Sequence, residues 1–207
     1  DVYALPLCAL FARLNSAACF YDAREIFREL AATREKRWVT RLIQWLENGF
    51  IRAAAAVFVT GSLDREYLEK EYSLDNVHIL RNLPLKTTGL VPVDFRTLYN
   101  INQAGIMLLY QGVLSEGRGI ETAMDILQRV ENAYLILLGS GPEKNYLSKR
   151  ARKRGIEDRV IFAGRIPQSL LLNYTAGADI GLCLVQNLSL SYYYALPNKL
   201  FEYTMAG

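Results

Sequence analysis

The sequence has few of the residues that build metal centres and disulfide frameworks. It contains one histidine, His78, and three scattered cysteines, Cys8, Cys19 and Cys183. This odd number of cysteines shows neither a disulfide framework nor metal-ligand spacing, which favours a reducing compartment. One histidine cannot complete a metal cluster with them, so we expect His78 to be a surface or loop residue. The sequence therefore predicts no metal site.

Long apolar runs and a strong net charge are missing as well. The apolar run 53–59 is far shorter than the roughly 20 residues that a membrane-spanning helix needs, and no signal peptide is visible. A net charge of +3 is too small to indicate a nucleic-acid partner. The composition, 51% hydrophobic and 22% charged, is that of an ordinary globular protein, and we expect it in the cytoplasm. Because the chain starts without Met in mid-pattern, we also expect it to be a piece of a longer protein.

What is present is an alternation of strands and helices, which predicts parallel sheets. In the first part of the chain, we expect strands at 18–21, 55–60 and 77–80, and helices at 1–15, 26–56 and 62–72. Ser62 is expected to cap the last of these helices. The helix 1–15 should bury one apolar face made of Leu7, Leu10, Phe11 and Leu14.

A second alternation follows a proline-containing stretch in which the periodicity fades. We expect strands at 107–110, 134–138, 160–163 and 179–184, and helices at 120–130, 143–154, 167–174 and from 197 onward. The helix 120–130 should point Ala123, Ile126, Leu127 and Val130 inward. The predicted fold class is α/β, with two Rossmann-like doubly wound parallel-sheet domains, both incomplete, which bind ligands at the carboxyl ends of their strands.

The basic segment Arg28–Arg52 has two interpretations. Its apolar stripe, Trp38, Leu42 and Trp45, could pack in a core while the charges face solvent. Alternatively, this helix could meet an anionic membrane that carries a lipid-linked acceptor, because tryptophan and arginine suit a membrane interface.

Three features fall at carboxyl ends of strands in the second part. They are the glycine loop 111–119 with Arg118, the tight turn 139–142, and the helix start 197–202 with Asn198, Lys199 and Glu202. Lys199 and Glu202, three residues apart, could be an ordinary pair on an exposed helix face. Alternatively, Lys199 and the helix N-terminus could bind a phosphate. Glycine loops, an arginine and a lysine on one sheet edge favour a nucleotide diphosphate ligand.

These stretches resemble a known family. YQGVLSEGRGIETAM, LILLGSGPE, RVIFAGRIP, YTAGADIGLCL and ALPNKLFEYTMAG are similar, in order and spacing, to the donor half of retaining GT-B glycosyltransferases. This large group includes bacterial capsule, lipopolysaccharide and teichuronic acid enzymes. FYDAREIFREL, VFVTGSLDREYLEKEY and LRNLP resemble the end of the acceptor half. The resemblance implies an acceptor-side domain at 1–83, a linker and domain entry at 84–106, and a nucleotide-sugar-binding domain at 107–207 that is incomplete at its C-terminus.

The resemblance also implies roles for particular residues. Arg118 would hold the donor diphosphate and Lys199 would contact the donor phosphate or sugar, so both would be catalytic, and Glu202 would accept from the ribose hydroxyls. Arg165 and Ile166 would edge the base. The residues expected to bind the donor are Gly112, Gly139, Gly141, Arg165, Asn198, Lys199 and Glu202.

Three positions depart from the family pattern. Tyr194 stands where many relatives have a second glutamate, eight residues before Glu202, and Val113 stands where many have an arginine. Arg24 replaces a frequent histidine beside Glu25. Arg24 could face an interdomain cleft, or Arg24 and Glu25 could have a structural role.

The implied function is sugar transfer with retention from a nucleoside-diphosphate sugar to a glycan or lipid-linked acceptor, without a metal or other cofactor. The departures keep open a non-catalytic nucleotide-binding or scaffold protein of the same fold, and a nucleotide-sugar 2-epimerase fits less well. The implied location is the cytoplasm, at the inner face of the cell membrane if the basic helix binds lipid. We expect this stretch alone to bind the donor weakly and to be inactive.

Overall fold

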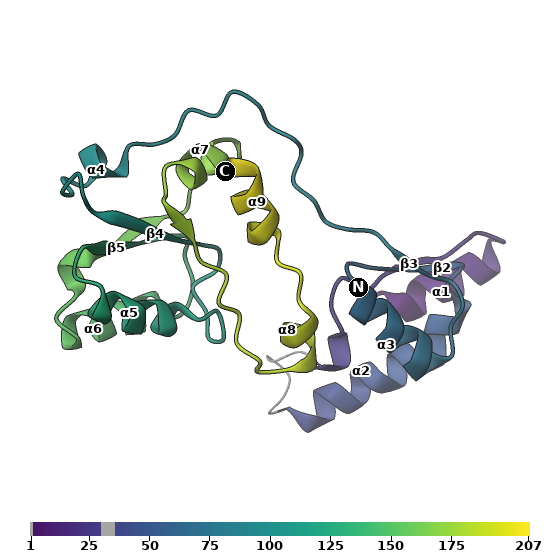
Figure 1. Ribbon diagram of the computed structural model, residues 1–207. Helices are drawn as coiled ribbons and strands as arrows, with labels where there is room; N and C mark the ends of the chain where they lie inside the picture. The colour runs from purple at the N-terminus through teal and green to yellow at the C-terminus, as the bar shows by residue number, and fades with distance from the viewer. Residues whose placement is uncertain (1, 30–35) are drawn as a thin grey trace. The chain divides into compact units, whose positions relative to one another are not determined.

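The computed structural model describes residues 2–29 and 36–207 and consists of two compact units (Figure 1). The first unit comprises Asp1–Asn82 and Asn187–Leu196, and the second comprises Leu83–Gln186 and Pro197–Gly207. The chain therefore leaves the second unit after Gln186 and returns at Pro197, an excursion that the sequence did not predict.

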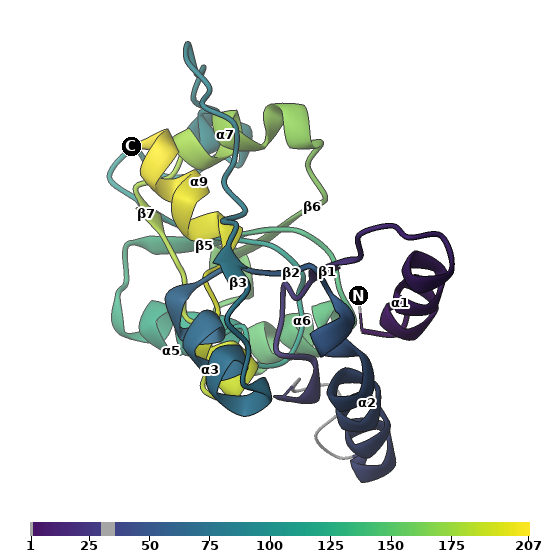
Figure 2. The same cartoon turned by 90° about the vertical axis from the view of Figure 1, so that its right-hand side faces the viewer.

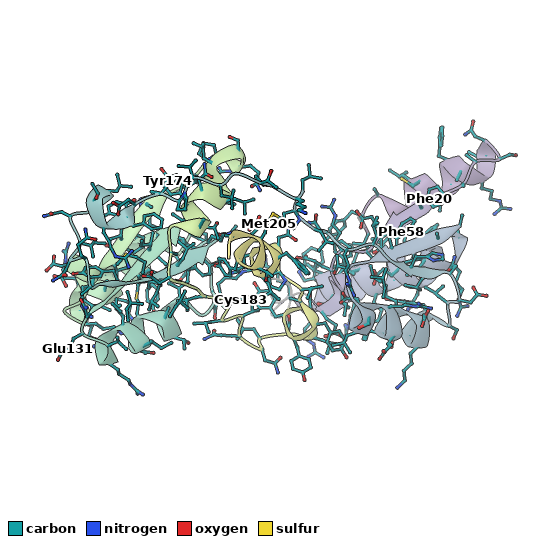
Figure 3. The ribbon with its side chains drawn as sticks, turned by 45° about the horizontal axis from the view of Figure 1, so that its top comes forward. Phe20, Phe58, Glu131, Tyr174, Cys183 and Met205 are labelled. Atoms are coloured by element: carbon teal, nitrogen blue, oxygen red, sulfur yellow. The ribbon has the colours of Figure 1, made fainter. Side chains whose placement is uncertain are left out.

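The first unit is built on a parallel sheet with the strand order β1-β2-β3. The strands are β1 (Phe20–Asp22), β2 (Ala56–Val59) and β3 (Val77–Ile79). On this sheet the rings of Phe20 and Phe58 lie 6.1 Å apart between centroids (Figure 3). The helices are α1 (Leu5–Leu14), η1 (Phe27–Glu29), α2 (Arg37–Phe50), η3 (Ile51–Ala53), α3 (Ser62–Tyr72) and α8 (Leu190–Tyr194). The helix α3 has Gly61, not Ser62, at its N-cap.

Helix α1 buries the face opposite to the one expected. Leu5, Ala9 and Ala12 are buried, whereas the predicted inward residues, Leu7, Leu10, Phe11 and Leu14, are 54–75% exposed. Both faces of this helix are apolar, so periodicity alone does not select one. The face with two alanines is the buried one, since small side chains permit close packing against the rest of the unit.

The segment expected to form one helix over 26–56 is divided. Arg28 belongs to η1, α2 starts at Arg37, and residues 30–35 lie outside the described part of the chain. Helix α2 buries Ile43 and Glu47. Trp38, Leu42 and Trp45 are 71%, 42% and 65% exposed, so the prediction that this stripe packs in the core is wrong for the unit as described.

The second unit has a four-stranded parallel sheet with the order β6-β5-β4-β7. The strands are β4 (Ile106–Gln111), β5 (Ala133–Leu138), β6 (Val160–Gly164) and β7 (Ile180–Gly181). The helices are α4 (Phe95–Leu98), α5 (Ile120–Arg129), α6 (Lys144–Lys153), η4 (Glu157–Arg159), α7 (Gln168–Ala176) and α9 (Asn198–Ala206). The α/β class with parallel sheets is confirmed.

Alternate residues of β4 serve the two faces of this sheet. Leu108 and Tyr110 pack with α5 and α6, whereas Met107 and Leu109 pack with α4, α7 and Tyr203 of α9 (Figure 1). Such burial on both sides explains why the strand reads as a nearly continuous apolar run. Helix α5 buries Ile120, Ala123, Met124 and Leu127, while two of its predicted inward residues, Ile126 and Val130, are 38% and 37% exposed.

The strand order reverses between β4 and β7. β4 pairs with both β5 and β7. The helix after β4, α5, covers one face, while α9, the next helix of this unit after β7, packs beside α7 on the other (Figures 1 and 2). The chain thus leaves these two adjacent strands in opposite directions. Doubly wound sheets bind ligands outside the carboxyl ends of such strands.

Candidate donor-binding site

A pocket of about 680 Å³ lies at the carboxyl ends of β4, β5 and β6 in the second unit. It is lined by the loops after β4, β5 and β6 and by the first turns of α9. All eight site residues expected in the second unit line it: Gly112, Arg118, Gly139, Gly141, Arg165, Asn198, Lys199 and Glu202. The structure therefore brings together residues spread over 91 positions of the sequence.

The glycines of the first two loops allow these loops to pack on each other. A Cβ on Gly139 would lie 1.9 Å from the carbonyl oxygen of Gly112, and a Cβ on Gly141 would lie 2.2 Å from that of Leu114. Gly139 also has a φ of +148°, which L side chains rarely adopt. The amide of Leu114 donates to the carbonyl of Ser140 at 3.0 Å, so the two loops form one rigid wall of the pocket.

Lys199 is buried at the start of α9. Its side chain is 7% exposed, and its Nζ has no hydrogen-bond partner among the described residues. The ammonium lies 3.9 Å from the centroid of the Tyr110 ring, a distance typical of a cation–π contact. The interpretation of Lys199 and Glu202 as a pair on an exposed helix face is therefore wrong, since Glu202 is only 8% exposed.

The surroundings of Lys199 lower the pKa of its amine. The pKa of its amine is lowered from 10.5 to about 8, chiefly by burial; Cys183 and Glu202 act to raise it, and the positive charge of Arg118 acts to lower it. A buried ammonium without a hydrogen bond is costly. The pocket consequently contains an unsatisfied positive charge beside a helix N-terminus, where the helix dipole adds partial positive charge.

Arg118 lines a second pocket in addition to the first. This pocket, of about 310 Å³, lies among the loop 115–119 and the first turns of α5 and α6. A guanidinium can grip a diphosphate through its planar fork of donors. Arg165, in contrast, is an exposed residue on the loop after β6.

Glu202 is held by a residue that the sequence analysis missed. Gln111, the last residue of β4, donates from Nε2 to Oε2 of Glu202 and accepts at Oε1 from the Thr175 hydroxyl at 2.8 Å. Gln111 and Thr175 are 3% and 5% exposed. A glutamine that ends an otherwise apolar strand was a visible signal in the sequence. Thr175, inside a helix of another segment, gave none.

Other predicted residues lie elsewhere. Arg24 forms an ion pair with Asp22 at 3.0 Å rather than with Glu25, and both partners are exposed. Tyr194 belongs to α8, which groups with the first unit. His78 is exposed on β3, as expected.

The described residues contain no group of three or more His, Cys, Asp and Glu side chains that could hold a metal ion. The three cysteines are free thiols. None of the helices in the described ranges is both long and apolar enough to cross a bilayer.

Comparisons with known proteins show the family of the chain. The model of the family "Glycosyl transferases group 1" matches residues 94–207, more than half of the chain. The α-D-kanosaminyltransferase of Streptomyces kanamyceticus is 27% identical in an alignment of 134 residues that covers 59% of this chain and 34% of that protein.

Solved structures share the fold. HepE of Anabaena, crystallised with UDP, superimposes with a TM-score of 0.66 at 20% identity over 89% of this chain and 51% of that one. Sucrose-phosphate synthase of Thermosynechococcus elongatus gives 0.64 at 22% identity over 79% and 41%. The chain thus spans about half or less of the length of these relatives. From the family match and this shared GT-B fold, we conclude that the chain belongs to the group 1 glycosyltransferases.

Proposed function

We propose that the protein transfers a sugar, with retention of anomeric configuration, from a nucleoside-diphosphate sugar to a glycan or lipid-linked acceptor. The observation that carries this proposal is the buried ammonium of Lys199, which has no hydrogen-bond partner among the described residues and lines the pocket at the N-terminus of α9. An anionic ligand would satisfy this charge. The donor diphosphate is the anion that a group 1 glycosyltransferase requires.

Three positive features would act on the donor diphosphate. Lys199 and the first turn of α9 would bind one phosphate, and Arg118 would grip the diphosphate as a bidentate donor. Glu202 would accept from the ribose hydroxyls, and Arg165 and Ile166 would edge the base. Asn198 and the glycine loops would complete the wall around the donor.

In the proposed reaction, the bond between the sugar C1 and the phosphate oxygen breaks while the acceptor hydroxyl bonds to C1 from the same face. The leaving phosphate takes the proton of that hydroxyl, so that no protein nucleophile is needed. Negative charge grows on the diphosphate, and preorganised cations aimed at such charge are usually the largest catalytic contribution. Because Lys199 and Arg118 supply this charge stabilisation, we propose that the reaction needs no metal.

The test begins with binding of UDP-, GDP- and ADP-sugars to the intact protein, measured by thermal shift and calorimetry. Transfer is then followed with the donor that binds, with and without EDTA, and the anomeric configuration of the product is read by NMR. Lys199→Met and Arg118→Ala should abolish most of the transfer. Lys144→Met, at an exposed lysine in the first turn of α6, is the matched control. If both site variants turned over normally, the assignment would be wrong.

A second candidate, a non-catalytic nucleotide-binding or scaffold protein, is favoured by one observation. Tyr194 stands where many relatives have a carboxylate, and it lies in α8 of the first unit. Donor binding without hydrolysis or transfer, across acceptors, would establish this candidate. A nucleotide-sugar 2-epimerase would instead release an isomerised donor, which the same NMR experiment detects.

We also propose that α2 binds an anionic membrane surface at the inner face of the cell membrane, where a lipid-linked acceptor would lie. Trp38, Leu42 and Trp45 form one exposed face of this helix, flanked by the exposed Arg37 and Arg41. Tryptophan places its amphipathic ring at a membrane–water interface. Each basic residue near an anionic surface adds about 1 kcal/mol of attraction.

Vesicle sedimentation tests this proposal. The intact protein should pellet with phosphatidylcholine vesicles that contain phosphatidylglycerol and remain in solution with pure phosphatidylcholine. Trp38→Ser/Trp45→Ser and Arg37→Glu/Arg41→Glu should each lower binding. Lys70→Glu/Lys86→Glu, at two exposed positions outside α2, reverses the same number of charges and is the control. Equal sedimentation with both vesicle types would contradict the electrostatic part of the proposal.

A further inference from the structure

The hydrogen bonds around Gln111 fix the orientation of its amide. A carboxylate only accepts hydrogen bonds, so the NH₂ group of Gln111 must face Oε2 of Glu202. The amide oxygen then faces Thr175, whose hydroxyl donates to it at 2.8 Å. The hydroxyl also lies 2.9 Å from the carbonyl of Leu171. The single hydrogen of this hydroxyl is shared between two acceptors, the Gln111 amide oxygen and the Leu171 carbonyl, while the charge of Glu202 fixes which end of the Gln111 amide faces Thr175.

The backbone of Gln111 contacts Tyr203, the residue after Glu202 in α9. Its N–H donates to the Tyr203 hydroxyl at 3.2 Å, and that hydroxyl donates to the carbonyl of Leu182 at 3.2 Å. The Tyr203 ring lies directly on Gly181, where a Cβ would approach the ring to 2.5 Å. Gln111, at the end of β4, therefore fixes the positions of Glu202 and Tyr203 of α9 relative to the sheet.

This arrangement uses one oxygen of the Glu202 carboxylate and leaves the other for a ligand. Glu202 lines the pocket, and no hydrogen bond to its Oε1 is found among the described residues. A carboxylate fixed in this way needs no reorientation when a hydroxyl arrives, which is the advantage of a preorganised acceptor.

We propose that Gln111 and Thr175 are positioning residues that fix Glu202 for recognition of a ribose hydroxyl, so that they set the preference for ribonucleotide over deoxyribonucleotide donors. This inference rests on the proposed function, because it assumes a nucleotide in the pocket. Thr175 does not line the pocket, and Gln111, which does, already uses its Nε2 and Oε1 atoms in the hydrogen bonds with Glu202 and Thr175. Their effect is exerted through the carboxylate alone.

The experiment measures the affinity of the intact protein for UDP, GDP and ADP and for their 2′-deoxy and 3′-deoxy forms by calorimetry. A hydrogen bond to a charged group corresponds to roughly a tenfold change in affinity or more. We therefore expect the wild type to prefer the ribonucleotide by about tenfold over at least one deoxy form. In Gln111→Met and Thr175→Val this ratio should fall toward one, while affinity for the deoxy form stays nearly constant.

Conservative variants separate positioning from general damage to the fold. Thr175→Ser keeps the hydroxyl and should retain the preference. Gln111→Glu places two carboxylates together, so ribonucleotide binding should weaken at neutral pH and recover as the pH falls and one of them takes a proton. Thr204→Val removes a hydroxyl from an exposed position of α9, where it bonds only to the carbonyl of Leu200 among the described residues, and serves as the control.

The outcomes are distinct. If ribo and deoxy forms lost affinity equally in Gln111→Met and Thr175→Val, the role would be structural and the inference overturned. If the wild type bound the diphosphates equally well in ribo and deoxy form, the proposed hydrogen bond between Glu202 and the ribose would be contradicted. The proposed binding of the phosphates would still be supported. If none of the diphosphates bound the wild type, the proposed function itself would fail.

Discussion

Glu47 in the first unit and Lys199 in the second are both charged residues buried on helices, with exposed fractions of 1% and 7%. Their surroundings differ. Both carboxylate oxygens of Glu47 accept hydrogen bonds, from the hydroxyls of Tyr21 and Tyr72, at 2.7 Å each. The ammonium of Lys199 has an aromatic ring below it and no hydrogen-bond partner among the described residues.

This difference separates a structural group from a binding group. A buried polar group that is fully hydrogen-bonded stabilises and specifies the core around it. A buried charge left unsatisfied lowers stability, and a fold retains it where a ligand supplies the missing interactions. The pKa shifts agree with this contrast. Burial and Glu47 raise the pKa of the Tyr21 hydroxyl, so that it stays a donor, whereas burial lowers the pKa of Lys199.

The largest expected effect is on catalysis. Lys199→Met should lower kcat/KM of the intact protein by about 10²–10³-fold, or about 3–4 kcal/mol, as loss of one preorganised donor to developing charge does. It should not lower the free energy of unfolding, because an apolar side chain of similar length replaces an unsatisfied ammonium. Steady-state kinetics and urea denaturation check both statements. If Lys199→Met lost stability but kept its activity, Lys199 would be a structural group like Glu47 and not a binding group.

Replacing Glu47, the buried charge of the first unit, should instead lower the free energy of unfolding. Glu47→Leu leaves the hydroxyls of Tyr21 and Tyr72 buried without their acceptor, at about 1–3 kcal/mol each. We therefore expect a loss of about 3 kcal/mol in the free energy of unfolding, measured by urea denaturation. The triple variant Glu47→Leu/Tyr21→Phe/Tyr72→Phe should regain most of it, since replacing all partners by apolar groups is nearly neutral. Equal losses in the single and triple variants would contradict this explanation.

The third prediction concerns pH. Below a pH of about 8 Lys199 is protonated and attracts an anion, so affinity for UDP should fall as the pH rises through that value, by up to about tenfold per pH unit. Bound anion raises the pKa, so the loss extends above pH 8. Calorimetry between pH 7 and 9.5 measures it. Lys199→Met should show no such dependence in that interval, and an unchanged slope in this variant would assign the titration to another group.

The same pKa shift predicts a change in stability with the opposite sign. The pKa of Lys199 is lowered from 10.5 to about 8 in the folded chain. Between these values the unfolded chain binds more protons than the folded one, so this group makes the ligand-free protein more stable as the pH rises. The free energy of unfolding of wild type minus that of Lys199→Met should therefore increase from pH 8 to 10.5.

The smallest effect tests the surface of α2. Trp38→Ser should change the free energy of unfolding by less than about 0.5 kcal/mol, as expected at an exposed position. Ile43→Ala, on the buried face of the same helix, should cost about 2–5 kcal/mol. Urea denaturation of the two variants compares the faces directly. A large loss in Trp38→Ser would show that this face is covered in the intact protein.

Residue patterns predicted more of the structure in the second unit than in the first. The loops after β4 and β5 and the start of α9 each contain a short sequence signal. The two loops contain glycines, and at Gly139 and Gly141 an added Cβ would have no room; α9 starts directly after Pro197. Because the carboxyl ends of parallel strands meet at one edge, these local signals were enough to predict that Arg118, Lys199 and Glu202 converge. The pocket contains all three. Their catalytic and binding roles remain proposals.

Patterns failed where two faces were equally apolar. Helix α1 carries two apolar stripes, and α2 carries Trp38 and Trp45 opposite a face that contains Glu47. Hydrophobic periodicity favoured the larger side chains as the core in α1, but close packing selected the face with small residues. A buried glutamate such as Glu47 is not predicted from periodicity, because its two tyrosine partners are about 25 positions away in the sequence.

The sequence by itself determined the α/β class, the glycosyltransferase family and the segments that form the pocket, because these depend on local periodicity and short loops. Only the tertiary structure decided that Lys199 is buried and unsatisfied, that Glu202 is held by Gln111 and Thr175, and that the tryptophans of α2 face outward. Burial and hydrogen bonding depend on residues from distant segments, and no short stretch of sequence contains that information.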